Sequence, residues 1–120
     1  MVKKIRFKEL GEIARVNRIT VALIYNKRKK PCKEQEKELE ILEKKLSSRG
    51  VMFVKLDRAK DNLQKELGVD TVPSIIMWIR NGIQVHYNFE KGGATYTQIN
   101  SFISADKLLK QIAFLLNSYN

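Results

Sequence analysis

The 120-residue chain contains one cysteine, Cys32, and one histidine, His86. A single cysteine cannot form a disulfide within the chain, which is typical of proteins from a reducing compartment. His86 has no cysteine or carboxylate partner at the spacing of a metal site, so we expect a surface histidine, no metal and no cofactor. The sequence also lacks a Walker-type phosphate loop and a set of residues that could form a catalytic triad.

Long apolar runs are absent as well. No run approaches the about 18 apolar residues that a membrane-spanning helix needs. The basic residues between positions 3 and 6 are not followed by the apolar core of a signal peptide. An apolar content of 43% and a charged content of 30% are typical of a single folded domain. We therefore expect a cytoplasmic globular protein that does not associate with a membrane.

Acidic residues are scarce in the first third of the chain. Residues 1–33 contain eleven Lys or Arg against two Glu, whereas residues 34–120 are nearly balanced, and the formal net charge of the whole chain is +10. A concentrated basic region predicts an anionic partner, such as nucleic acid or an acidic protein surface. The alternative is a solvated surface rich in Lys and Glu that has no partner.

Hydrophobic periodicity predicts an α/β protein. The expected strands cover residues 3–8, 20–25, 51–57, 75–80 and 83–88, with a tight turn at Asn81-Gly82 between the last two. The expected helices cover residues 9–16, 31–49 and 61–67, followed by one around Ile99, Phe102 and Ile103. Residues 20–25 are apolar throughout, so that strand should be buried on both faces of a sheet and pair in parallel with 51–57.

The chain's one cysteine lies at the boundary between the strand 20–25 and the helix 31–49. Pro31 suits the first turn of a helix, which places Cys32 at the positive end of that helix. Functionally, this end and the neighbouring lysines would favour a reactive thiolate at Cys32. Structurally, Cys32 can equally be a small buried apolar residue. The sequence leaves both interpretations open.

Two segments resemble the thioredoxin family. Residues 28–33 read Arg-Lys-Lys-Pro-Cys-Lys where the family has Trp-Cys-Gly-Pro-Cys-Lys, and residues 68–74 read Gly-Val-Asp-Thr-Val-Pro-Ser where it has Gly-Ile-x-x-Ile-Pro-Thr. The order of the predicted elements is also similar to the family order. The resemblance covers about residues 3–103. It implies a thioredoxin-like fold, with a mixed four- to five-stranded sheet flanked by helices and a cis-proline at Pro73 that faces the Pro31-Cys32 loop.

The redox residues of the family are altered here. By the resemblance, Lys29 stands in place of the attacking cysteine, Leu23 in place of a buried acid, and Arg28 in place of the tryptophan. A dithiol cycle needs two sulfurs, because the second one releases the mixed disulfide formed by the first. We therefore expect a binding protein and no enzyme. The alternative is a monothiol oxidoreductase that acts through Cys32.

The loop before the helix is the predicted binding site. Its residues are Lys27, Arg28, Lys29, Lys30, Pro31 and Lys33. Cations next to a helix N-terminus can bind carboxylates or phosphates, so we expect an acidic protein surface or a nucleic acid backbone as partner. By the resemblance, Val72 and Pro73 would add a substrate-binding edge. The alternative is a loop kept soluble by its lysines.

The end of the chain carries one further apolar stripe: Leu108, Leu109, Ile112, Leu115 and Leu116. Ser104 or Asp106 can cap a helix there. We therefore expect a thioredoxin-like domain over residues 1–103 and a helical extension over residues 104–120. The extension either covers the sheet of its own domain or forms a homodimer.

Overall fold

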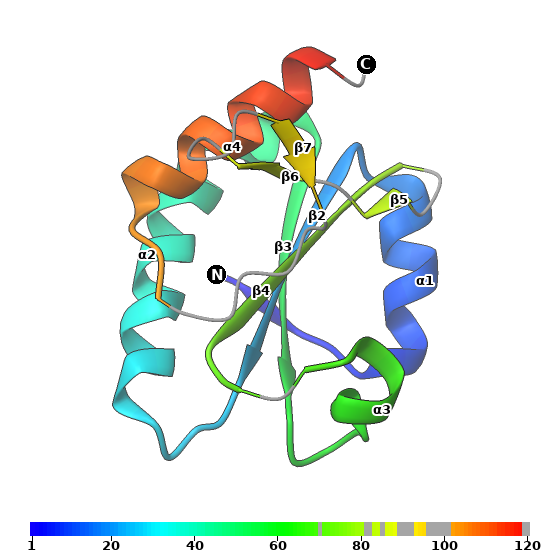
Figure 1. Cartoon of the computed structure of the whole chain (residues 1–120), viewed down its shortest axis with the longest axis vertical. Coiled ribbons are helices and arrows are strands. Elements are labelled where there is room, and N and C mark those ends of the chain that lie inside the picture. The colour runs from blue at the N-terminus through cyan, green and yellow to red at the C-terminus, as the bar shows by residue number, and fades with distance from the viewer. Residues whose placement is uncertain (70, 81–82, 85, 89–92, 96–101, 119–120) are drawn as a thin grey trace.

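A computed structural model describes residues 1–69, 71–80, 83–84, 86–88, 93–95 and 102–118 of the chain (Figure 1). Its main sheet has five strands in the order β1-β3-β2-β4-β5, and a second sheet pairs β6 with β7. The strands are β1 (Lys3–Lys4), β2 (Ile19–Tyr25), β3 (Val51–Asp57), β4 (Ser74–Ile79), β5 (Ile83–Gln84), β6 (His86–Asn88) and β7 (Gly93–Thr95). The predicted α/β class and the mixed sheet are confirmed.

Strand β2 lies in the middle of the main sheet. It pairs in parallel with β3, from Ile19 opposite Val51 to Tyr25 opposite Asp57, and antiparallel with β4. All seven β2 residues are buried. An uninterrupted apolar run is the pattern that a strand covered on both faces requires, and the sequence prediction of a central strand is correct.

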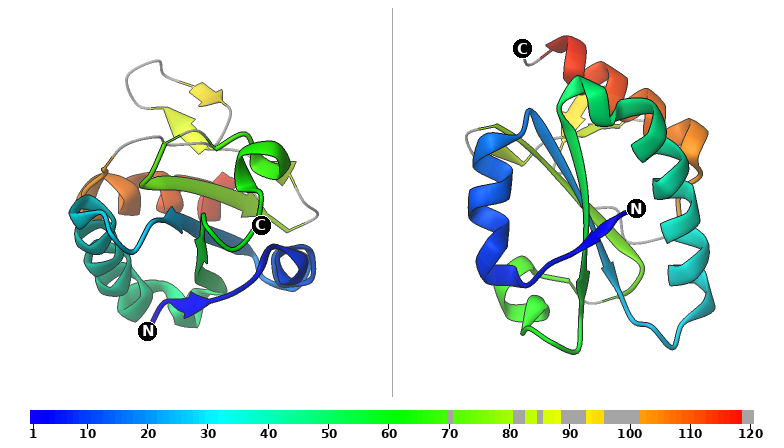
Figure 2. Two further views of the ribbon diagram at one scale, coloured as in Figure 1. Left: turned by 90° about the horizontal axis from the view of Figure 1, so that it is seen from below. Right: turned by 180° about the vertical axis from the view of Figure 1, so that it is seen from behind.

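Helices cover both faces of this sheet. Helices α1 (Phe7–Val16) and α3 (Leu63–Leu67) lie on one side, and α2 (Lys30–Leu46) and α4 (Ala105–Ser118) lie on the other (Figures 1 and 2). The apolar stripe of α2, formed by Leu39, Leu42 and Leu46, is buried as expected. The short 3₁₀ turn Ser47–Arg49 replaces the predicted last turn of α2, and Gly50 ends it with a φ of +85°. No described helix is both long and apolar enough to cross a membrane.

The first helix begins earlier than the sequence predicts. The expected strand over 3–8 is reduced to Lys3–Lys4, and α1 starts at Phe7 instead of residue 9. The N–H of Arg6 donates to Glu9 Oε1 at 3.1 Å, and the N–H of Phe7 donates to Asp61 Oδ2 at 3.0 Å. These carboxylates satisfy the free donors of the first helical turn, so capping overrides the short alternating pattern.

The segment before α4 is not helical, so the helix expected at Phe102 and Ile103 is wrong there; Ile99 lies outside the described residues. The cause is Gln35, a fully buried side chain of α2. Its Nε2 donates to the Ile103 carbonyl at 2.9 Å, and its Oε1 accepts from the Ile103 N–H at 2.8 Å. The Gln35 side chain thus forms hydrogen bonds with the Ile103 N–H and carbonyl, which would otherwise bond within a helix.

Helix α4 packs against the rest of the same chain. Ser104 Oγ accepts from the Lys107 N–H at 3.4 Å, as predicted for a cap, and Glu38 of α2 accepts from the Ala105 N–H at 3.1 Å. The apolar stripe of α4 is buried in the common core, except that Leu109 is only partly covered. These contacts favour the interpretation in which the helix covers its own sheet, while the domain boundary at residue 103 and the homodimer stay predictions.

The hairpin region differs from the expected single return strand. Within the described part of the expected return strand, β5 pairs with β4, through Trp78 opposite Gln84 and Ile79 opposite Ile83. β6 belongs to the second sheet with β7. The predicted turn at Asn81-Gly82 and the surface position of the His86 side chain lie outside what the structure describes.

Candidate functional site

The loop between β2 and α2 exposes its cations because Asn26 holds it in a turn. Asn26 Oδ1 accepts from the Arg28 N–H at 3.0 Å, and the Asn26 carbonyl accepts from the Lys29 N–H at 2.9 Å. Such side-chain-supported turns are typical of asparagine. Lys29 is the N-cap and α2 begins at Lys30, one residue before the predicted start. Residues 27–31 and Lys33 are all exposed.

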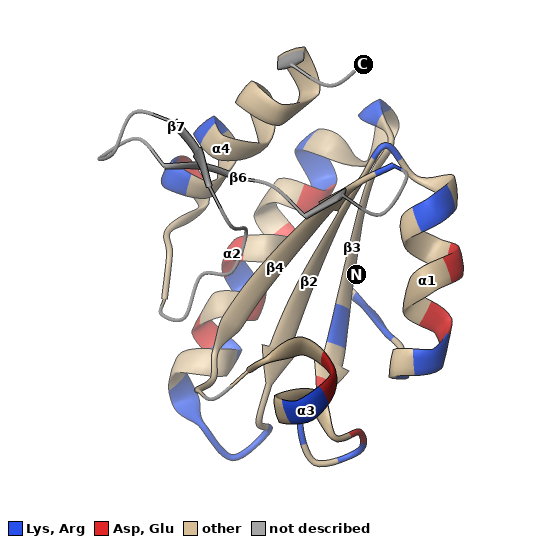
Figure 3. Ribbon diagram, turned by 45° about the vertical axis from the view of Figure 1, so that its right-hand side comes forward, with Lys and Arg blue, Asp and Glu red and all other residues tan. Residues whose placement is uncertain are grey.

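A second basic loop lies beside the first. The Arg58 N–H donates to the Tyr25 carbonyl at 2.9 Å, which joins the loop after β3 to the end of β2. A cavity of about 410 Å³ between the loops is lined by residues of both, including Arg28 and Lys60. Parallel strands place their carboxyl ends at the same edge of a sheet, where ligands of α/β proteins commonly bind. Figure 3 shows the loop before α2 as a continuous run of Lys and Arg at this end of the molecule.

We call this region the basic edge and define it by seven residues: Lys27, Arg28, Lys29, Lys30, Lys33, Arg58 and Lys60. In the part of the chain that the structure describes, none of the seven forms an ion pair. Two acids nearby are engaged elsewhere, since Asp57 is buried and accepts from the Ala59 N–H at 2.9 Å, and Asp61 binds Arg6. The positive charge of the edge is therefore available to an anion.

Cys32 lies under the basic edge, with 2% of its surface exposed. Its Sγ accepts a hydrogen bond from the Asn26 N–H at 3.5 Å. It also forms part of the wall of a cavity of about 270 Å³, together with Lys33 and Lys55. Burial of this degree favours the structural interpretation of Cys32, and the cavity is the one observation that keeps the monothiol alternative open.

Glu36 is partly buried and lines the same cavity as Cys32. Leu23, which by the resemblance stands in the place of the family's buried acid, is fully buried and lies opposite Lys55 in the β2–β3 register. Lys55 Nζ binds Glu36 Oε2 at 2.8 Å and lies 5.5 Å from the centroid of the Tyr25 ring. Burial raises the pKa of Tyr25, which keeps this phenol neutral at physiological pH.

Val72 and Pro73 directly precede β4, whose first residue, Ser74, lies opposite Ile24 of β2. Both are buried, and the peptide bond between them is cis. Neither is among the described residues that line the two cavities at the basic edge. The structure therefore brings the predicted lysines and Arg28 together, and it leaves the predicted substrate-binding edge at Val72 and Pro73 untested.

Sequence reasoning missed Arg58 and Lys60 as members of the site. The parallel pairing of strands 20–25 and 51–57 contained the necessary signal, because it brings residues 26–30 and 58–60 to one edge. Among the described residues, no group of three His, Cys, Asp or Glu side chains could hold a metal ion.

Comparison with solved structures defines the fold. Chloroplastic thioredoxin z superposes with a TM-score of 0.75 and 20% sequence identity, over 98% of this chain and 95% of that one. A thioredoxin mutant from Halobacterium salinarum gives 0.73 and 21%, over 98% and 90%. The germline-specific thioredoxin Deadhead of Drosophila gives 0.72 and 20%, over 96% and 99%. No protein-family model and no curated protein match the sequence.

The chain therefore has a thioredoxin-like fold, as the two local motifs predicted. Identities near 20% define the architecture and leave the activity open. The alignment with thioredoxin z spans 98% of this chain, so α4 lies almost entirely within the matched region.

Proposed function

We propose that this chain is a redox-degenerate thioredoxin-like binding protein whose basic edge binds an acidic protein surface or a nucleic acid backbone. The observation that carries the proposal is the basic edge itself. Two loops and the first turn of α2 present seven cations without ion-pair partners among the described residues. The helix N-terminus adds backbone donors that favour a bound anion.

The residues at the former redox positions support binding over catalysis. Lys29 is the exposed N-cap of α2, so the first sulfur of a dithiol pair is missing. Leu23 is fully buried, so no carboxylate replaces the lost acid there. Cys32 is buried beneath the loop. The monothiol oxidoreductase remains the second candidate function, on the single observation that Cys32 forms part of a cavity wall.

A salt titration with matched charge variants tests the proposal. The probes are single-stranded RNA, duplex DNA and poly-glutamate, each measured by mobility shift or anisotropy at two salt concentrations. Three or four phosphate contacts should give a slope of about −3 for log affinity against log salt concentration, since each contact contributes about −0.7 to −0.9. Little sequence preference is expected, because phosphate contacts position a nucleic acid without specifying its sequence.

The double variant Lys29→Glu/Lys30→Glu should abolish binding and leave the fold intact, since exposed loop charges contribute little to stability. The control is Lys107→Glu/Lys110→Glu on α4, which changes the net charge equally at the opposite end of the molecule (Figure 1). Binding to poly-glutamate alone would identify an acidic protein surface as the partner. Equal losses in both variants, or no binding to any probe at low salt, would overturn the proposal.

A further inference from the structure

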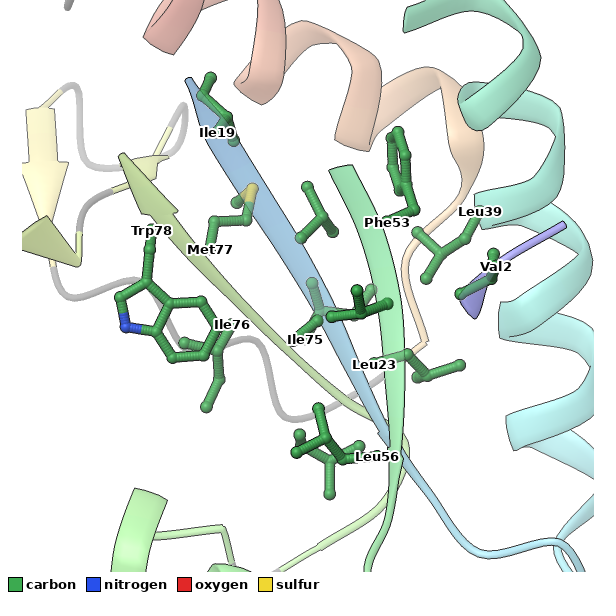
Figure 4. Close-up of a cluster of buried hydrophobic side chains, with 14 of the residues drawn as sticks. Val2, Ile19, Leu23, Leu39, Phe53, Leu56, Ile75, Ile76, Met77 and Trp78 are labelled. Carbon is green, nitrogen blue, oxygen red and sulfur yellow. The ribbon is translucent and has the colours of Figure 1, made fainter. Parts of the chain in front are cut away.

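A large cavity lies away from the basic edge, on the side of the sheet that α1 and α3 cover. It is a groove of about 760 Å³ bounded by Phe7, Leu10 and Ala14 of α1, Leu67 of α3 and Trp78 of β4. Figure 4 shows the Trp78 ring on the side of β4 that faces away from Leu39 of α2. Grooves of this volume with mostly apolar walls are the usual form of a binding site.

The α1 wall of this groove is a helical stripe. Positions 7, 10, 11 and 14 follow the spacing i, i+3, i+4 and i+7, so they share one face of α1. At 1.5 Å per residue, this stripe is about 10 Å long, or two turns of helix. A second helix laid along it would place its own apolar residues at the same spacing.

Gly11 opens the middle of the stripe. It lies inside α1, where glycine is less favourable than alanine. A Cβ added at Gly11 would meet no atom within 4 Å, and Gly11 is not among the glycines with positive φ. Neither crowding nor backbone conformation among the described residues therefore requires glycine here. Its bare backbone leaves room for close approach by another chain.

The charges along the groove have one sign. The charged side chains among its described lining residues are Lys8 and Arg15, one near each end of the stripe. Arg15 is paired with Glu12 of the same helix, whereas Lys8 is exposed and has no ion pair in the described part of the chain. At the start of α1, Glu9 accepts from the Arg6 N–H, and Asp61 is occupied by Arg6 and by the Phe7 N–H. A complementary partner would carry acidic residues beside its apolar face.

We propose that this groove binds an amphipathic helix of a partner protein, with apolar residues spaced i, i+3 or i+4, and i+7, and with acidic flanks. The apolar wall, the two-turn length, the opening at Gly11 and the cation Lys8, unpaired among the described residues, all fit that occupant. The site is independent of the basic edge, so one chain would hold two partners or two segments of one partner.

The chain contains its own reporter for this site. Trp78 is its only tryptophan, is 8% exposed and lines the groove. The probe is a synthetic two- to three-turn helical peptide without aromatic residues, with leucine on one face and glutamate on the flanks. Titration into the full chain should change the Trp78 emission in a saturable way. The same peptide with lysine flanks should bind at least about tenfold more weakly.

Variants at Gly11 separate groove binding from a general effect on the fold. Gly11→Leu should weaken peptide binding at least about tenfold, because its side chain fills the opening. Gly11→Ala should raise the urea midpoint and change the affinity by less than about threefold. Lys37→Leu, which adds the same side chain to an exposed position of α2, should leave the affinity unchanged.

Three results would overturn the proposal. The first is no saturable change of Trp78 emission at peptide concentrations up to about 1 mM, which would place the dissociation constant above that concentration. The second is peptide binding that Gly11→Leu does not weaken. The third is binding of decanoate, but not of the peptide, with the same dependence on Gly11, which would make the groove a site for a small apolar anion.

Discussion

Thr20 is a fully buried polar residue whose hydroxyl has no hydrogen-bond partner among the described residues. It lies on β2 directly opposite Trp78 of β4. A buried hydroxyl without a partner lowers stability, because it loses its hydrogen bonds to water and forms none in the folded protein. Ser74, at the start of β4, is equally buried, but its Oγ donates to the Thr71 carbonyl. These two residues allow the cost of an unpaired hydroxyl to be measured within one sheet.

Replacing Thr20 with valine should stabilise the protein. Valine has nearly the same shape, favours strands and has no hydroxyl to satisfy, so the free energy of unfolding should rise by about 1–2 kcal/mol. Urea denaturation measures the change. The control Ser74→Ala should lower stability by about 1 kcal/mol, since it removes a hydroxyl that is bonded. A loss of stability in Thr20→Val would mean that its hydroxyl has a partner in solution.

The Cys32 thiol should react slowly in the folded protein. Its burial and its contact with the Asn26 N–H predict that a thiol reagent modifies it at least about tenfold more slowly than in the urea-unfolded chain. Cys32→Ser should fold and bind the anionic probes as the parent does. Rapid native-state reaction with glutathione disulfide, together with turnover that Cys32→Ser lacks, would support the monothiol oxidoreductase instead.

At the level of whole elements, Arg6 and Asp61 connect the start of α1 to the loop before α3. Arg6 Nε and one terminal nitrogen each donate to Asp61 at 3.1 Å, and the other Asp61 contact is the Phe7 N–H. The hydrogen bonds from Arg6 and then from Phe7 lower the pKa of Asp61. The sequence did not predict this contact, because 55 residues separate the partners and no local pattern joins them.

Stability should depend on pH through Asp61. Its carboxylate has a lower pKa in the folded state than the about 3.9 of an unfolded chain, so its contribution is complete above about pH 5 and is lost as the pH falls through the folded pKa. Asp61→Asn should therefore lose less stability than the parent between about pH 5 and pH 3. Unfolding curves at several pH values, each at constant salt, measure the difference. Parallel pH profiles for the two proteins would contradict it.

The central elements were predictable from sequence and the first and last ones were less so. β2 and β3 are long apolar runs, and Gly50 marks the end of the helix between them, so their positions follow from local pattern. The start of α1 and the non-helical segment at Ile103 depend on Asp61 and Gln35, which contact them from distant parts of the chain. Hydrophobic periodicity contains no information about such polar contacts.

At the scale of the whole molecule, the fold was predictable and the partner was not. Two motifs about forty residues apart, around Pro31 and Pro73, were sufficient for a thioredoxin-like fold. The lysines of the basic edge could be named from sequence, and Arg58 and Lys60 required the sheet. The partner depends on a surface outside this chain, so its class follows only from charge.

Removal of α4 tests how far the molecule folds as one unit. Four α4 residues are essentially fully buried: Leu108, Ile112, Leu115 and Leu116. Burial of each side chain stabilises the fold by about 1.5–3 kcal/mol. The sum for the four is comparable to the free energy of unfolding of a typical domain, about 5–15 kcal/mol. A chain truncated after Ile103 should therefore lose cooperative urea unfolding. A truncated chain that unfolds cooperatively while the full chain alone is dimeric would assign α4 to a dimer interface.

The pairing of Gln35 with Ile103 also has a consequence during synthesis. The two residues are 68 positions apart, so at about 5–20 residues per second the partner is made roughly 3–14 s after Gln35. Helix formation takes about a microsecond, so α2 can form long before Ile103 exists. Throughout that interval the buried amide of α2 lacks its native partners, and the apolar face that α4 will cover is open to water. Nascent chains should be most prone to aggregation in this window, which ends only when α4 has left the ribosome.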